Sequence, residues 1–161
     1  MKKICAILLL IIFVCISGCK SKCEGLKTIE VPEVGSIKIP KTWQCCRENE
    51  FIYFYDEKLS NEFEKAKPLI VGVVTDDGKD IEKISDYYGE KITYVDLVKS
   101  QVFSNNAIVS KTIFNIGNDK CEKASVWIGS EHKSAYFIVL DEKIEYEEVL
   151  KIGESFRMHL E

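Results

Sequence analysis

After about residue 31, the chain contains short stretches in which apolar residues follow the spacing of strands. Ser36–Ile39 alternates polar and apolar residues and ends at Pro40, which cannot donate to a strand ladder. Phe51–Tyr55 is rich in aromatic residues and therefore favours a strand. Leu69–Val74 is a continuous apolar run, which is typical of a buried strand. These stretches predict three strands in the first half of the chain.

A helical region is predicted next. Ile81, Ile84 and Tyr88 recur at the spacing of one helical face, and Gly89 ends that stretch. A second helical stretch is expected over Thr93–Val102, because Thr93 begins a sequence that resembles a capping box. Its largely apolar face would comprise Tyr94, Leu97, Val98, Gln101 and Val102.

Three further strands and a closing helix complete the pattern. The strands are expected at Ile108–Ile116, Ala124–Ile128 and Ala135–Leu140, with a hairpin at Gly117–Asp119. The last segment has acidic residues at its start and basic residues at its end, which suits a helix dipole. The core stripe of this helix would be Val149, Ile152 and Phe156.

The predicted order is therefore β-β-β-α-β-β-β-α. Strands joined by short turns are usually antiparallel neighbours, and helices then cover the sheet. We expect an α+β fold, a layered α/β/α sandwich with a mostly antiparallel sheet. The chain has 161 residues, of which 46% are hydrophobic and 30% charged, so it is long enough for one domain. That domain is expected to span residues 31–161.

The first eighteen residues have the three-part layout of an export signal. Lys2 and Lys3 precede an uncharged run from Ile4 to Ile16, and the small residues Ser17 and Gly18 follow it. At 1.5 Å per residue this run would span only about 20 Å, whereas a bilayer core needs about 30 Å. We therefore interpret residues 1–18 as a signal peptide rather than a transmembrane helix.

The junction Ile16-Ser17-Gly18-Cys19 resembles the lipobox of bacterial lipoproteins. The resemblance implies that the thiol of Cys19 takes a diacylglyceryl group and that cleavage makes Cys19 the first mature residue. Further acylation, for example with palmitate, would give stable anchoring in a membrane. Residues 19–30 would then be a polar lipidated tether that holds the domain at the extracytoplasmic face of the bacterial cell membrane. Secretion without lipid and a cytosolic location are the alternatives.

Charge and motifs narrow the classes of partner. The formal net charge is −4, and it becomes −6 when Lys2 and Lys3 leave with the signal. An acidic domain lacks the basic face that nucleic acids require. The sequence contains neither a phosphate-binding loop nor a dinucleotide fingerprint, so we expect no nucleotide and no cofactor.

The domain also resembles the PsbP-like class of α/β/α sandwiches, named for an extrinsic protein of photosystem II. The resemblance rests on Ile39-Pro40-Lys41-Thr42-Trp43 after the first predicted strand and on Glu154-Ser155-Phe156-Arg157 in the closing helix. It extends from about Val31 to Met158. It implies a fold shared with bacterial lipoproteins of unknown role. Neither segment is a catalytic signature, so the resemblance implies no activity.

The chain has seven cysteines, of which four remain after removal of the signal and lipidation of Cys19. An even number in an exported chain indicates disulfides, and adjacent cysteines rarely bond to each other. We expect two bonds, each joining one of the adjacent pair to one of the other two cysteines. Free thiols are the alternative, and a zinc site is disfavoured because no C-x-x-C pair is present. The four are Cys23, Cys45, Cys46 and Cys121.

The sequence offers no arrangement typical of an enzyme. Only two histidines, His132 and His159, are present, and they cannot form a paired-histidine metal site. Trp43 is expected on a loop after Pro40, where its ring could contact a ligand. We predict a non-catalytic domain that binds an envelope protein. A small-molecule or glycan-binding module that uses Trp43 is the alternative, and an enzyme is the third hypothesis.

Overall fold

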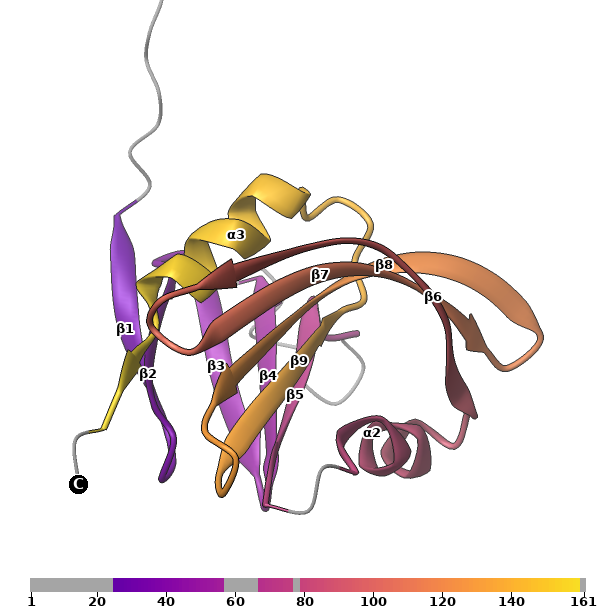
Figure 1. The fold of residues 1–161 in the computed structure, drawn as a ribbon, viewed down its shortest axis with the longest axis horizontal. Helices are drawn as coiled ribbons and strands as arrows, with labels where there is room; N and C mark the ends of the chain where they lie inside the picture. The colour runs from indigo at the N-terminus through magenta and orange to yellow at the C-terminus, as the bar shows by residue number, and fades with distance from the viewer. Residues whose placement is uncertain (1–24, 57–66, 77–78, 160–161) are drawn as a thin grey trace, which may run out of the picture.

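A sheet of seven strands forms the centre of the molecule (Figure 1). The computed structural model describes residues 25–56, 67–76 and 79–159. Its strands are β1 (Leu26–Val31), β2 (Gly35–Pro40), β3 (Trp43–Glu48), β4 (Phe51–Asp56), β5 (Ile70–Thr75), β6 (Ile92–Phe103), β7 (Ala107–Ile116), β8 (Asp119–Gly129), β9 (Ser134–Val139) and β10 (Arg157–Met158). Its helices are α2 (Asp80–Tyr88) and α3 (Tyr146–Ser155).

The large sheet has the order β3-β4-β5-β9-β8-β7-β6, and every pair of neighbours is antiparallel. A small sheet, β1-β2-β10, joins the two ends of the described chain. Helix α3 lies on one side of the curved strands β6–β8, and α2 lies on the other (Figure 1). The predicted α+β class and the mostly antiparallel sheet are confirmed.

The two faces of the large sheet have separate cores. On one face, α3 and the small sheet enclose a core that includes Ile37, Val109 and Phe156. On the other face, which we call the α2 face, Ile84 of α2 packs with Val71, Val73 and Phe114. The predicted stripe of the closing helix is confirmed, because Val149, Ile152 and Phe156 are all buried.

Hydrogen bonds from side chains fix both helices to the sheet. The backbone N–H of Ile92 donates to the hydroxyl oxygen of Ser85 at 2.9 Å, which joins α2 to the start of β6. The side-chain amide of Asn105, in the β6–β7 turn, donates to the carbonyl oxygens of Gly153, Glu154 and Phe156. Gly153 and Glu154 lie in the last turn of α3 and Phe156 follows it, where carbonyl oxygens lack the full set of helical donors. Asn105 therefore holds the end of α3 against the β6–β7 hairpin.

The predicted helix over Thr93–Val102 is wrong, because these residues belong to β6. The pairing of β6 with β7 shifts register between Tyr94 and Asp96 and again between Leu97 and Lys99. Each shift inserts one extra residue, as in a β-bulge. Residues on one face of β6 are consequently spaced by three instead of two at these points, and this spacing imitates a helical face.

The predicted order β-β-β-α-β-β-β-α is also wrong, since β1, β3 and β10 were missed. All of strand β1 except Val31 lies within residues 19–30, which were predicted to be tether, so the folded domain begins near Leu26. Strand β1 has only one buried residue and is held mainly by backbone pairing with β2, a contact that leaves little hydrophobic pattern. Strand β3 begins at Trp43, which was predicted to lie on a loop.

Gly72 of β5 lies opposite Phe137 of β9 in the register of the sheet. A Cβ atom at position 72 would lie 2.2 Å from the ring of Phe137. We predict that Gly72→Ala lowers the free energy of unfolding by about 1–3 kcal/mol through overpacking. Chemical denaturation of Gly72→Ala, Phe137→Leu and the double variant measures this effect. The double variant should lose less than the sum of the two single losses, and strict additivity would contradict the proposed clash.

Candidate functional site

Trp43 is not available as a ligand contact. Its side chain is only 8% exposed and belongs to the core on the α3 side of the sheet. Its ring packs against Phe54, with the ring centroids 6.4 Å apart. The predicted loop position is therefore corrected to a buried position at the start of β3. Burial of the ring in the core removes the basis for a ligand role.

The three cysteines within the described residues form no disulfide with one another. Cys45 and Cys46 lie on β3, and Cys121 lies on β8. Strands β4, β5 and β9 separate β3 from β8, which is on the order of 19 Å at the usual strand spacing. A disulfide needs Cα atoms within about 7 Å. The predicted bond between Cys121 and Cys45 or Cys46 therefore cannot form across this separation. Cys19 and Cys23 lie outside the described residues, and a bond of Cys23 to Cys45 or Cys46 stays a prediction.

The thiols of Cys45 and Cys121 are weak nucleophiles in the folded chain. Burial raises the pKa of the Cys45 thiol, and the nearby Arg47 offsets this only in part. Burial likewise raises the pKa of the Cys121 thiol. A raised pKa lowers the fraction of reactive thiolate at neutral pH.

Within residues 25–56, 67–76 and 79–159, no group of three or more histidine, cysteine, aspartate or glutamate side chains could hold a metal ion. His159 instead contacts the carboxylate of Glu30 at 2.8 Å, so it links β1 to the C-terminal segment. His132 is exposed in the turn between β8 and β9.

Exposed apolar side chains concentrate on the edge strand β6. Val102 is the most exposed of them, at 72%, and Tyr94 is exposed at 58%. Val95, Leu97 and Val98 are also exposed. A group of large apolar residues on one strand differs from the scattered exposure that is normal on protein surfaces. Such a group indicates a surface for binding a partner.

The register of the sheet extends this patch across three strands. Val102 lies opposite Ile108 of β7, which lies opposite Trp127 of β8. Trp127 in turn lies opposite Tyr136 of β9, which packs against the core under α2. Residues directly opposite each other in a sheet share a face. Val102, Ile108 and Trp127, which we call the open row, therefore continue the apolar surface of the α2 face out to the sheet edge.

The open row is only partly covered by the rest of the described chain. Ile108 and Trp127 are half-buried, and Val102 is exposed. Among the described residues, none of the three belongs to either core cluster. The row is built on three paired strands, so hydrogen bonds between the strands fix its backbone.

The edge of β6 is less suited to binding than its face. The two register shifts place extra residues at Val95 and Val98. Bulges on an edge strand twist its free N–H and C=O groups away from a regular ladder and oppose the addition of a strand. The arrangement therefore favours contact through side chains of the α2 face over backbone pairing at the edge.

The opposite face near β6 has side chains of both charges. The ammonium of Lys99 lies 3.8 Å from the centroid of the Tyr146 ring, and the hydroxyl of Tyr146 donates to the carbonyl of Val109. The ammonium of Lys111 lies 2.9 Å from the carboxylate of Glu122, and this contact raises the pKa of Lys111. The opposite charges of Lys111 and Glu122 cancel each other, so this pair attracts a charged ligand only weakly.

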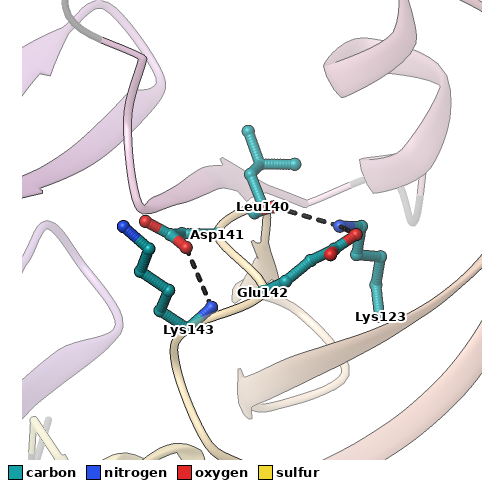
Figure 2. A network of polar contacts seen from close by, with 5 residues as sticks. All are labelled: Lys123, Leu140, Asp141, Glu142 and Lys143. Atoms are coloured by element: carbon teal, nitrogen blue, oxygen red, sulfur yellow. Dashed lines mark hydrogen bonds and ion pairs between the residues drawn. The ribbon is translucent and has the colours of Figure 1, made fainter.

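Lys123 lies where β8 separates from β9, and its contacts are shown in Figure 2. Its ammonium donates to the carbonyl oxygen of Leu140 at 3.0 Å and lies 3.6 Å from the carboxylate of Glu142. The side chain of Lys123 is 12% exposed, whereas that of Glu142 is 87% exposed. Asp141 is held separately, because its carboxylate accepts from the backbone N–H of Lys143.

Comparison with known proteins concerns the fold alone. No protein-family model and no curated protein matches the chain. The solution structure of cyanobacterial PsbP (CyanoP) from Synechocystis sp. PCC 6803 is similar, with a TM-score of 0.52 and 8% sequence identity. The match covers 88% of this chain and 96% of that chain. The chain has a PsbP-like fold. At this identity the PsbP-like fold carries no function with it.

No helix among the described residues has the length and apolarity needed to span a bilayer. The open row was missed by sequence reasoning because Thr93–Val102 was assigned to a helix. The β-branched residues in that stretch were a signal for a strand. Lys123 left no sequence signal, because its burial depends on where β8 and β9 separate.

Tyr136, at the covered end of the apolar row, gives a test of this packing. Burial raises its pKa to about 12, although a hydrogen bond with Ser125 acts in the opposite direction. The unfolded chain ionises this group near pH 10, so between pH 10 and 12 the unfolded state binds fewer protons. Its contribution to stability is present below pH 10 and is lost as the pH rises, by up to roughly 2–3 kcal/mol.

We therefore predict a shallower loss of stability above pH 10 in Tyr136→Phe than in the natural chain. Denaturant titrations at several pH values measure the slope. Tyr94→Phe, which removes the hydroxyl of an exposed tyrosine, is the matched control. Equal slopes for Tyr136→Phe and the natural chain would show that Tyr136 is accessible to solvent.

Proposed function

We propose that this protein is a lipid-anchored, extracytoplasmic bacterial lipoprotein whose domain binds an envelope protein without catalysing a reaction. The observation that carries the proposal is the open row of Val102, Ile108 and Trp127 on a rigid sheet. Its support from the sequence is the lipobox that ends at Cys19. Apolar surface of this kind is stabilised when a partner removes it from water.

The partner that fits best is an amphipathic helix. Seven strands make a sheet roughly 29 Å wide, whereas one helix has a diameter of about 10 Å. Helix α2 has only nine residues, and it contacts mainly β5 and the start of β6. A helix from the partner, placed on the open row, would extend the layer that α2 begins. Its apolar residues would recur at i, i+3 and i+4.

The anchor would keep this surface near the membrane. The first strand begins at Leu26, so only six residues separate it from Cys19. Fully extended, that stretch reaches about 25 Å. The mature chain has a formal charge of −6 and would be repelled weakly by anionic lipids. The proposed partner is therefore a membrane protein or another envelope protein that is held close to the same bilayer.

Cys19→Ala is predicted to abolish incorporation of labelled palmitate in cells, because the thiol is the only acceptor that the lipobox provides. Metabolic labelling followed by immunoprecipitation measures this. Cys23→Ala, which changes a cysteine four residues beyond the junction, is the matched control and should label normally. Labelling of the Cys19→Ala variant would contradict the lipobox assignment.

A photo-crosslinking residue at position 102 is predicted to capture one envelope protein in living cells. The same residue at Lys151, an exposed site on α3, should not capture it. Asp at position 108, next to the crosslinker, should lower the yield more than tenfold, because a charge in an apolar interface costs well over about 1.4 kcal/mol.

The identity of the adduct decides between partners. An adduct with a second copy of this chain would show that position 102 mediates self-association and not the binding of an envelope protein. Absence of any adduct at position 102, or equal capture at position 151, would overturn the proposal. Circular dichroism of each variant confirms that the fold is intact.

A further inference from the structure

The large sheet opens between β8 and β9. These strands pair only from Ser125 opposite Ile138 to Gly129 opposite Ser134. Beyond Ser125, β8 continues towards Asp119 in pairing with β7 alone. After β9 the chain stays beside the start of β5 and not beside β8, since the backbone N–H groups of Leu140 and Asp141 both donate to the carbonyl of Leu69. A wedge therefore separates the first half of β8 from residues 140–141.

An apolar cavity of about 490 Å³ lies at this wedge. Its apolar walls are Pro68, Ile92, Ile116 and Leu140. A second cavity, of about 320 Å³, adjoins it, and Lys123 lines both. The remaining lining residues are charged, namely Lys67, Glu90, Lys123 and Asp141. A volume of several hundred Å³ that combines apolar walls with polar groups is typical of a site for a small molecule.

The side chain of Lys123 is only 12% exposed, and Figure 2 shows its contacts. Its ammonium has one neutral acceptor, the carbonyl of Leu140, at 3.0 Å. Its ion pair with Glu142 is long, at 3.6 Å, and the Glu142 side chain is 87% exposed. Burial of an ammonium is costly unless a close anion and hydrogen bonds compensate it. The ammonium can donate three hydrogen bonds, so it has capacity for a better anionic partner.

The other charges that line the apolar cavity compete weakly with Lys123. Lys67 and Glu90 are exposed, carry opposite charges and are screened by water. The carboxylate of Asp141 already accepts from the N–H of Lys143 at 2.9 Å. The buried ammonium therefore sets the preferred charge of a ligand, and the walls set its apolar body.

We propose that the cavity at the β8–β9 wedge binds an amphipathic carboxylate, with its chain between Ile92, Ile116 and Leu140 and its carboxylate on Lys123. The ligand carboxylate would displace that of Glu142, which is free to turn into water. The hydrogen bond from Lys123 to Leu140 would remain and hold the ammonium in place. This site is separate from the open row, so it adds a small-molecule activity to the proposed protein-binding function.

The test is calorimetric titration of the lipidated mature protein in nanodiscs with octanoate, after subtraction of empty nanodiscs. The expected result is saturable binding with one site and a Kd below about 1 mM. Octan-1-ol, which lacks the charge, and acetate, which lacks the chain, should each bind at least tenfold more weakly. Both parts of the ligand are needed, because the alkyl chain contacts the apolar walls and the carboxylate contacts the ammonium of Lys123.

Variants assign the binding to Lys123. Lys123→Met keeps the apolar stem and removes the charge, and it should weaken octanoate binding at least tenfold. Lys123→Arg should retain most of the affinity. Lys120→Met, an exposed lysine on the same strand that does not line the cavity, is the matched control and should bind like the natural chain.

Three outcomes would overturn the proposal: no saturable heat with octanoate in the natural protein, unchanged affinity in Lys123→Met, or octan-1-ol binding as tightly as octanoate. Thermal unfolding of each variant shows whether the fold is retained. If Lys123→Met fails to fold, the ratio of octanoate to octan-1-ol affinity in the natural chain still decides the result. The crosslinking at position 102 is independent of all these outcomes.

Discussion

The structure depends on the need to cover both faces of one curved antiparallel sheet. A sheet with two apolar faces is stable only when both are removed from water. Helix α3 and the small sheet meet this need on one face, where Val109, Phe137 and Phe156 are buried. On the other face, within the part of the chain that the structure describes, one helix of nine residues packs over Val73 and Phe114. Because this face is covered less than the other, the open row remains accessible on β6–β8. The apolar cavity lies where β8 separates from β9.

Much of this fold was predictable from local sequence pattern. The inner strand β5 is largely a continuous apolar run, and Gly89 adopts the left-handed conformation that ends α2. The hairpin at Gly117 and the stripe of α3 also follow rules of spacing and turn chemistry. In each case the residues that form the element lie next to one another in the chain. Local pattern is sufficient where neighbours in sequence share one environment.

Prediction failed where contacts between strands, rather than the pattern within one segment, decided the structure. Strand β6 looked helical because its two register shifts are set by pairing with β7. Strand β1 looked like a tether because its partner is the backbone of β2. The candidate site failed for the same reason, since Trp43 is buried by Phe54 and other residues distant in sequence. The separation of Cys45 from Cys121 and the burial of Lys123 depend on strand order, which no single segment encodes.

The small sheet has a consequence for the order in which the chain folds. Strand β2 pairs on one side with β1 and on the other with β10, which lies about 120 residues later in the chain. A chain that emerges from its N-terminus first cannot complete this sheet until Arg157 and Met158 appear. Closure over so long a loop is slow, because the contact is far from local. Until then the edge of β2 that receives Arg157 and Met158 has no partner strand, and the contact between the two ends of the described chain is missing.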